Sequence, residues 1–191
     1  MEEFEIKFLE VDVPELEKKL LAIGATKVAE YNYSIAFFDY PDLRMEKDHA
    51  WLRLRTDGKE TTLAYKQRIG VQSNDASVPD EGMKETEIIV DNFLKTYDIF
   101  KSIGFVIKRE MEKKRIRYQK GKAVFDIDFW PRVPTFIEVE ADSLENARAA
   151  ALELGFDPDK GLICSASSVY VKYGIDPNDY ISMTFKEFVK K

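Results

Sequence analysis

Hydrophobic and polar residues alternate along several stretches of the chain, as they do in β-strands with one apolar face. Near the N-terminus, Phe4 and Ile6 alternate with Glu3, Glu5 and Lys7. Similar alternation, bounded by turn residues, predicts strands at about residues 3–10, 26–40, 50–56, 60–69, 84–90, 105–118, 123–130 and 135–141. The main element of the fold is therefore expected to be a mostly antiparallel sheet.

Three other stretches have apolar residues at helical spacing. Asn92 and Ser143 are favourable N-caps for two of them, and Pro14 suits the first turn of the third. A glycine follows each stripe, as at many helix C-termini. The predicted helices cover residues 13–23, 92–103 and 143–154. A strand, a helix ending in Ile-Gly and a long strand occur twice, which indicates two halves built alike.

The length and the order of these elements predict a single domain of residues 1–191 with an α+β fold of about eight antiparallel strands. Residues 70–82 are polar and rich in turn formers, so they are expected to form a long loop. The tail, about residues 156–191, is expected to consist of short helices that pack on the body.

The composition limits the classes of protein to which this chain can belong. With 45% hydrophobic and 34% charged residues, the 191-residue chain is typical of a folded globular protein with additional charge. The net charge of −6 argues against nucleic acid as a partner. No apolar stretch is long enough to span a membrane, and the N-terminus lacks the pattern of a signal peptide, so a cytoplasmic protein is expected. The single Cys164 excludes an intramolecular disulfide and fits a reducing compartment.

The polar positions of the predicted strands are mostly charged, with like charges on each strand. Acidic pairs occur at Glu3/Glu5, Glu85/Glu87, Asp126/Asp128 and Glu138/Glu140, and basic groups at Arg53/Arg55, Lys66/Arg68 and Lys113/Arg115/Arg117. For any one strand, a solvated face is the ordinary explanation. The predicted helices need the apolar faces, however, so the charged faces are expected to look inward. A closed eight-stranded barrel has room inside for one small ligand.

The sign of the charge on each strand indicates which ligand would bind. Like charges on one strand repel unless a counter-ion lies between them. Carboxylate oxygens suit Mg²⁺ or Mn²⁺, and Arg and Lys suit phosphate oxygens. The pattern therefore predicts binding of a triphosphate together with Mg²⁺ or Mn²⁺. Cys164 and the only histidine, His49, lie outside the charged series and are expected to be structural.

The ordered series of charged residues resembles the CYTH superfamily, also called triphosphate tunnel metalloenzymes. This superfamily includes class IV adenylate cyclases, thiamine triphosphatases and inorganic triphosphatases. The family's Glu-x-Glu-x-Lys motif matches residues 3–7, and its later elements follow in the same order at Arg53/Arg55, Lys66, Glu85/Glu87, Arg115/Arg117, Asp126/Asp128 and Glu138/Glu140. The match covers about residues 1–141. The tail segment Ser167–Lys172 departs from the family's Ser-Tyr motif, so it is given no catalytic role.

The resemblance implies a fold and a set of site residues. The fold is an eight-stranded antiparallel closed β-barrel, the triphosphate tunnel, with helices packed outside. Lys7 would be the catalytic residue beside the reacting water or phosphate. The proposed phosphate ligands are Arg53, Arg55, Lys66, Lys113, Arg115 and Arg117. The proposed metal ligands are Glu3, Glu5, Glu138 and Glu140, assisted by Asp126 or Asp128 and by one of Glu85 and Glu87, with Glu87 preferred.

The substrate and the reaction stay open at this point. Hydrolysis of a nucleoside, thiamine or inorganic triphosphate is favoured because, unlike the cyclase reaction, it does not require a pocket that recognises a base. A class IV adenylate cyclase, which makes cyclic AMP and pyrophosphate from ATP, is a close second, with the 70–82 loop and the aromatic residues of 31–40 as candidates for base recognition. The pattern is also compatible with a non-catalytic polyphosphate-binding module, or with a barrel whose inner charges only pair with one another. The expected partner is a small-molecule triphosphate, and a homodimer is left open.

Overall fold

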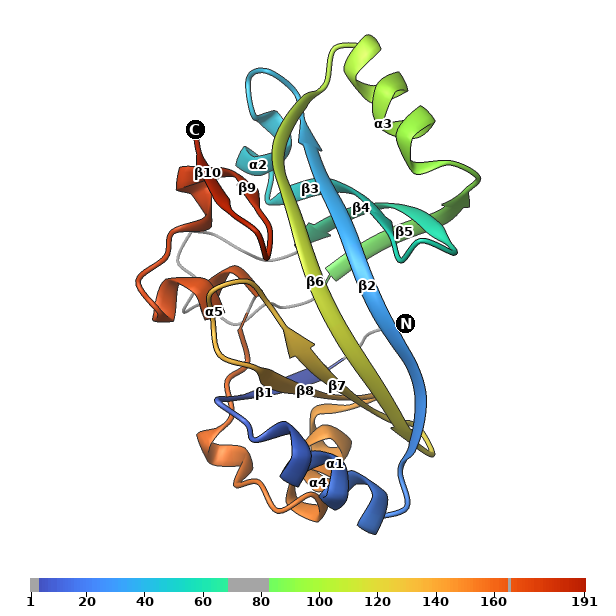
Figure 1. The fold of residues 1–191 in the computed structure, drawn as a ribbon, viewed down its shortest axis with the longest axis vertical. Helices are drawn as coiled ribbons and strands as arrows, with labels where there is room; N and C mark the ends of the chain where they lie inside the picture. The colour runs from blue at the N-terminus through green and yellow to red at the C-terminus, as the bar shows by residue number, and fades with distance from the viewer. Residues whose placement is uncertain (1–3, 69–82, 165) are drawn as a thin grey trace. The chain divides into compact units, whose positions relative to one another are not determined.

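The computed structural model describes residues 4–68, 83–164 and 166–191, and the chain divides into two compact units. Unit 1 comprises Met1–Tyr31 and Lys114–Tyr173, and unit 2 comprises Asn32–Lys113 and Gly174–Lys191. Two of the boundaries fall inside the two longest strands, β2 (Thr26–Asp39) and β6 (Val106–Lys120) (Figure 1). Glu3 and the predicted 70–82 loop lie outside the described residues.

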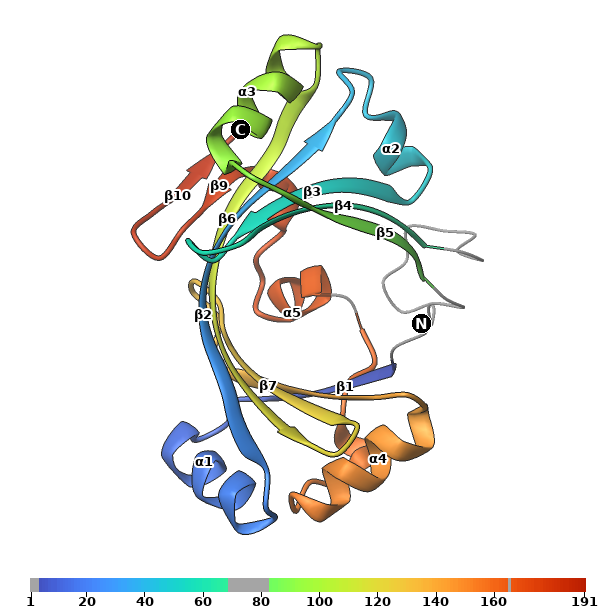
Figure 2. The ribbon, with the colours of Figure 1, turned by 90° about the vertical axis from the view of Figure 1, so that its right-hand side faces the viewer.

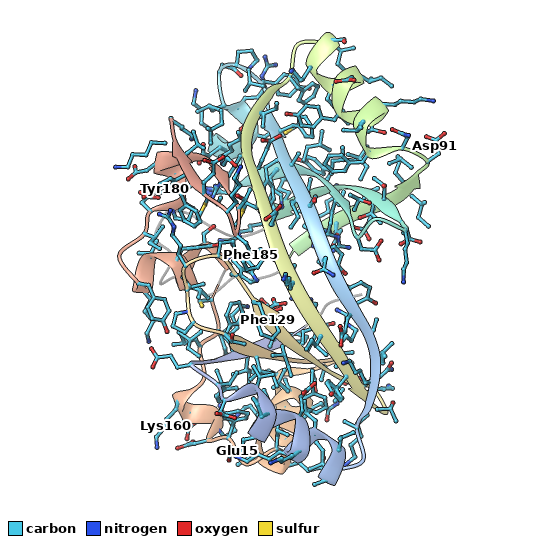
Figure 3. All side chains as sticks on the ribbon, viewed as in Figure 1. Glu15, Asp91, Phe129, Lys160, Tyr180 and Phe185 are labelled. Carbon is cyan, nitrogen blue, oxygen red and sulfur yellow. The ribbon has the colours of Figure 1, made fainter. Side chains whose placement is uncertain are left out.

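Unit 1 is an antiparallel sheet with helices on its apolar face. β1 (Phe4–Leu9) pairs with β8 (Phe136–Ala141), β8 pairs with β7 (Ala123–Phe129), and β7 pairs with the second half of β6. α1 (Val13–Ala22) and α4 (Leu144–Glu153) pack against this sheet through a buried core that includes Ile6, Leu20, Phe125, Ile127 and Ala147. Figure 2 shows α1 and α4 on one side of the sheet and α5 (Ala166–Lys172) on the other. Charged residues of this unit such as Glu15 and Lys160 lie on the outer surface (Figure 3).

Unit 2 is built on the same plan. The second half of β2 pairs with β3 (Ala50–Thr56), which is followed by β4 (Thr61–Arg68) and β5 (Met83–Val90), all antiparallel. α3 (Phe93–Ser102) covers the apolar face, and its Phe93, Tyr97 and Phe100 pack against a core that includes Phe38 and Leu54. The apolar residues of the helix predicted at 92–103 therefore face the core.

Two parts of unit 2 differ from the prediction. The short helix α2 (Arg44–Lys47) was not predicted, and it forms because the buried Asp39 carboxylate accepts hydrogen bonds from the backbone N–H groups of Met45 and Glu46, each at 3.0 Å. The tail does contain short helices, η1 (Pro158–Lys160), α5 and η2 (Pro177–Asp179), but its end forms a hairpin of β9 (Tyr180–Met183) and β10 (Phe188–Lys190). Strands of four and three residues are too short to show a recognisable period, and β9 is held by parallel pairing with β6.

The remaining elements confirm a mostly antiparallel α+β fold. Asn92 and Ser143 cap their helices as predicted, accepting hydrogen bonds from the N–H groups of Lys95 and Asn146. The strand order is β1-β8-β7-β6-β2-β3-β4-β5, with β9 and β10 off this path. Among the described strands no pairing joins β5 to β1, so closure into a barrel stays a prediction, as does a single domain of residues 1–191. No helix in the described part of the chain is long and apolar enough to cross a membrane.

Candidate functional site

The charged side chains on the strands of unit 1 that were predicted as site residues share the sheet face opposite α1 and α4. Lys7 of β1 lies opposite Glu138 of β8, Glu138 lies opposite Asp126 of β7, and Asp126 lies opposite Arg117 of β6. Residues directly opposite one another in antiparallel strands point to the same face. Four strands therefore place a row of charged side chains across the sheet, with two carboxylates in the middle and a cation at each end.

Neighbouring rows on the same face add further charges. Glu5 lies opposite Glu140, and Asp128 lies opposite Arg115. Lys7 and Asp126 are each 1% exposed, and Asp128 is fully buried. Burial of this degree rules out the explanation that the face is simply a solvated strand surface, because isolated charges are expensive to remove from water.

Arg115 is the centre of the buried charges. Its Nε donates to Asp128 Oδ1 at 2.6 Å, and its Nη2 donates to Asp128 Oδ2 and to Glu138 Oε2, both at 2.5 Å. Its Nη1 donates to Asp126, which also accepts from Nε of Arg117 at 2.8 Å. Burial alone would lower the pKa of Arg115, but the surrounding carboxylates outweigh burial and raise it. Arg115 therefore holds the acidic strands β7 and β8 together.

Lys7 is a permanent positive charge in this network. Its Nζ binds Glu5 and lies 3.4 Å from Glu138 Oε1. Burial opposes the charged form, but the charges of Glu138 and Glu5 raise the pKa of Lys7 well above its usual value. A lysine with a raised pKa cannot act as a general base near neutral pH. Lys7 is therefore suited to hold an anionic group.

The carboxylates of this face have the chemistry of a site for a hard divalent cation. Desolvation, followed by the negative charge of Glu138, raises the pKa of Glu5. A cation between these carboxylates would relieve that repulsion, and Glu5, Glu138 and Glu140 offer only oxygen donors, which Mg²⁺ and Mn²⁺ prefer. Within the described residues, no three acidic, cysteine or histidine side chains are already grouped around a metal position. Both oxygens of Asp128 accept from Arg115, and those of Asp126 accept from Arg115 and Arg117.

The charged face of unit 2 lies opposite the face covered by α3 and carries an excess of cations. Arg53 Nη2 donates to Glu87 Oε2 at 2.8 Å, and Lys66 Nζ lies 2.7 Å from Glu85 Oε2. Arg55 Nη2 lies 3.7 Å from the same Glu87 oxygen. Although burial opposes it, the pKa of Glu87 is lowered by Arg55 and Arg53. Both Glu85 and Glu87 are thus held by cations, and the described residues do not favour one of them as a metal ligand.

Tyr33 of β2 links two of the predicted phosphate ligands. The Arg55 guanidinium lies 4.8 Å and the Lys113 ammonium 5.5 Å from the centre of its ring. Cations at this distance from an aromatic face are attracted to it. Tyr33 therefore orients Arg55 and Lys113, a role that the pattern of charged positions does not indicate.

Similarity to known proteins identifies the family of the chain. The family model for the CYTH domain matches residues 1–154. The chain belongs to the CYTH domain family. No curated protein matches the sequence of this CYTH domain.

Several solved structures share its fold. A proposed adenylate cyclase from Vibrio parahaemolyticus is 15% identical, with a TM-score of 0.72 over 90% of this chain and 98% of that chain. A protein from Pyrococcus horikoshii OT3 is 17% identical, with a TM-score of 0.68 over 87% and 98%. HpAC1 from Hippeastrum, a proposed adenylyl cyclase described as having a dominant triphosphatase activity, is 16% identical, with a TM-score of 0.61 over 94% and 99%. At these identities the likeness shows the fold alone.

The predicted site residues that the structure describes, which do not include Glu3, fall on two faces, one in each unit. Unit 1 carries Lys7, Arg115, Arg117, Glu5, Asp126, Asp128, Glu138 and Glu140. Unit 2 carries Arg53, Arg55, Lys66, Lys113, Glu85 and Glu87. With every group ionised, three cations and five anions leave the first set at −2, and four cations and two anions leave the second at +2.

Two further features of unit 1 were not predicted from the sequence. Cys164 lies outside the charged series in the sequence, but in the structure it is close enough to Lys7, Glu5 and Glu138 for their charges to influence it. Burial raises the pKa of its thiol, which disfavours the thiolate and agrees with the expectation that it is not a nucleophile. The segment at Leu162 also pairs with Lys7. Residues 161–164 have no periodic pattern from which either contact could be predicted, because a single bridge involves too few residues to repeat.

His49, by contrast, has a φ of 53° and accepts a backbone hydrogen bond from Arg68, consistent with a structural turn.

Proposed function

We propose that this CYTH domain is a divalent-metal-dependent triphosphatase that hydrolyses the terminal phosphoanhydride of a small-molecule triphosphate. The observation that carries the proposal is the separation of charge, −2 on the described site residues of unit 1 and +2 on the described site residues of unit 2. A triphosphate bound with its metal ion needs both an acidic and a basic set of ligands. The eight-stranded tunnel predicted from the sequence belongs to this proposal.

The metal ligands are proposed to be Glu5, Glu138 and Glu140, together with Glu3. These residues offer oxygen donors only, and the pKa of Glu5 is raised by burial and then by the negative charge of Glu138, which a cation would offset. When bound, Mg²⁺ or Mn²⁺ would supply neutralisation of phosphate charge and a lower pKa for a coordinated water. Asp126 and Asp128 are proposed to act indirectly, since arginine binds both oxygens of each, whereas Arg115 binds Glu138 through Oε2.

The cations are proposed to bind and orient the phosphate groups. The proposed phosphate ligands are Lys7 and Arg117 in unit 1 and Arg53, Arg55, Lys66 and Lys113 in unit 2. Arginine and lysine side chains held in place before the reaction stabilise the charge that develops on the transferred phosphoryl group. Because the pKa of Lys7 is raised, it would remain a donor throughout and would not accept the proton of the attacking water.

Similarity of fold to HpAC1, which is described as having a dominant triphosphatase activity, supports hydrolysis as the reaction. The decisive experiment measures release of phosphate, pyrophosphate and cyclic AMP from ATP, tripolyphosphate and thiamine triphosphate, each with Mg²⁺ and with Mn²⁺. Release of phosphate from at least one substrate, dependent on the metal, is expected. Release of cyclic AMP and pyrophosphate from ATP would replace the proposal with an adenylate cyclase.

Two variants test the metal ligands. Glu5→Gln and Glu140→Gln should each abolish metal-dependent turnover with little change in folding, because each removes one negative donor and keeps the shape of the side chain. Glu15→Gln, on the exposed surface of α1, is the matched control and should behave like wild type. Full activity of either site variant would refute the assignment of metal ligands.

Binding measurements distinguish hydrolysis from the two non-catalytic roles. Tight binding of tripolyphosphate without any turnover would indicate a binding module. If tripolyphosphate with Mg²⁺ does not raise the melting temperature, the charged side chains only pair with one another.

A further inference from the structure

The backbone of Lys7 is bound from outside the predicted sheet by the tail segment that contains Gly161 and Leu162. The Lys7 N–H donates to the Leu162 carbonyl, and the Leu162 N–H donates to the Lys7 carbonyl, both at 2.9 Å. In antiparallel pairing, the N–H and C=O of one residue point to the same side of the strand. Both backbone groups of Lys7 therefore point away from β8. Leu162 satisfies groups that would otherwise lie unpaired at the edge of β1.

This pairing also affects the side chain of Lys7. Because the backbone groups of Lys7 are directed to Leu162, Lys7 and Glu138 form a non-hydrogen-bonded pair across β1 and β8. Side chains are closer in such a pair than in a hydrogen-bonded one. The Lys7 Nζ accordingly lies 3.4 Å from Glu138 Oε1. The edge pairing thus favours the position in which the Lys7 ammonium contacts its carboxylates.

Glycine is required at position 161 because there is no room for a side chain, and not because of the backbone conformation. Its φ of −73° and ψ of 155° are open to any residue. A Cβ at this position, however, would lie 2.2 Å from Ile6 Cγ2 and 3.0 Å from Phe8 Cζ. Ile6 is 1% exposed and is packed in the core, so it has little room to move. Only glycine lets the segment approach β1 this closely.

The segment is anchored on both sides of this contact. Before it, Pro158 is buried and Asp159 accepts a hydrogen bond from Arg148 of α4 at 2.5 Å. After it, the ring of the fully buried Tyr170 in α5 lies 5.5 Å from that of Trp130. A segment fixed at both ends can transmit its position to β1.

We propose that Gly161 and Leu162 form an edge clamp on β1, and that Gly161 is a positioning residue for Lys7. The effect on turnover rests on the proposed triphosphatase function, whereas the ordering of Lys7 by the clamp does not. The clamp acts by holding the β1 backbone at Lys7, so that the ammonium stays against Glu138 and Glu5.

Gly161→Ala is the first test, because one methyl group should separate the tail from β1. Amide hydrogen exchange followed by NMR should show faster exchange at Lys7, by about tenfold or more, since an opened edge amide loses its protection. The amides of Ile6 and Phe8 face β8 by strand alternation and should stay protected. Turnover of the best triphosphate should fall about tenfold to a hundredfold in kcat, as expected for a displaced catalytic group. A smaller change in KM would distinguish displacement of Lys7 from general loss of binding.

Leu162→Pro is the second variant, in case Gly161→Ala does not fold. It removes the N–H that binds the Lys7 carbonyl and adds no atom at position 161, whose extended conformation is compatible with a following proline. The same increase in Lys7 amide exchange is expected. Ile163→Ala is the control, because Ile163 is next in the chain but exposed, and it should leave exchange and turnover unchanged.

The results that would overturn the proposal are distinct from those that would overturn the proposed function. If Lys7 amide exchange does not change in either variant, the clamp is refuted. If exchange increases while kcat stays at the wild-type value, Gly161 does not position Lys7 for turnover. If wild type hydrolyses no triphosphate, the proposed function fails. The ¹⁵N signal of the Lys7 ammonium, assigned by its loss in Lys7→Arg, then tests whether the clamp orders the Lys7 side chain. That signal should broaden in Gly161→Ala if the clamp orders the side chain, and an unchanged signal would refute it.

Discussion

Replacing Arg115 with methionine should cause a large loss of stability. The change removes the charge and the donors that hold Asp126, Asp128 and Glu138, and it keeps much of the side-chain volume. Removing one partner of a buried ion pair typically costs about 3–5 kcal/mol, because the other partner is left uncompensated. Arg117 still binds Asp126, and Lys7 still lies 3.4 Å from Glu138, which places the cost toward the lower end of that range.

The loss of stability in Arg115→Met should depend on pH in a defined direction. Without Arg115, burial and mutual repulsion should raise the folded-state pKa of the remaining carboxylates above their unfolded values of about 4. A group whose pKa is raised by folding contributes stability below its unfolded pKa and loses it as the pH rises through its folded pKa. The free energy of unfolding that Arg115→Met loses relative to wild type should therefore be largest at pH 7 and above, and should decrease as the pH falls toward 4.

Urea denaturation followed by circular dichroism, at pH 7.5 and at pH 5, measures both effects. Arg148→Met is the matched control, because its ion pair with Asp159 is exposed and should contribute about 1 kcal/mol or less. A loss below about 1 kcal/mol in Arg115→Met would refute the role of Arg115 as the buried centre of the network. A deficit that is the same at both pH values would show that the carboxylates are not left uncompensated.

Three other predictions concern single side chains. Tyr33→Leu should weaken tripolyphosphate binding by about two- to fivefold in calorimetry, since a cation–π contact contributes about 0.5–1 kcal/mol. Tyr33→Phe keeps the ring and should bind normally. An equal loss of affinity in both variants would show that the hydroxyl matters instead. Burial and the hydrogen bond to Glu110 raise the pKa of Tyr97 to about 12, so the stability from this pair is present below pH 10 and is lost between pH 10 and 12. Tyr97→Phe should therefore lose less stability than wild type over that interval in alkaline denaturation, and parallel curves would contradict the prediction. Ser143→Ala should destabilise the protein by about 1 kcal/mol in urea denaturation because it removes the N-cap of α4, whereas Ser143→Asp should retain most of the stability.

Much of the fold could be predicted from alternation and caps. The strand at residues 50–56 was predicted with the bounds that the structure has, and α3 begins one residue after its predicted cap, Asn92. These elements are long enough for several repeats of their period, and their apolar faces pack on one another. α2 and the β9–β10 hairpin were missed because each depends on a tertiary contact, the Asp39 carboxylate in one case and the edge of β6 in the other.

The residue types of the candidate site were also predictable, but their partners were not. Alternation shows that Asp126 and Asp128 share a face, and it cannot show that both bind Arg115 two strand positions along β6 from Arg117. Likewise, the charge of Lys7 is evident from the sequence, whereas its contact with Leu162 requires the path of the tail. Contacts of this kind depend on rotamers and on chain segments far apart in sequence.

The division of the chain has a consequence for the order of folding during synthesis. Most of unit 2, residues 32–113, is one continuous stretch, whereas unit 1 joins residues 1–31 to residues 114–173. The contacts of β3, β4 and β5 are therefore local and can form while the ribosome is still translating the rest. β1 must wait for β8, which is synthesised more than 120 residues later. Until then its apolar residues, Ile6 and Phe8, have no core to enter, so the first strand to leave the ribosome is among the last to be protected from aggregation.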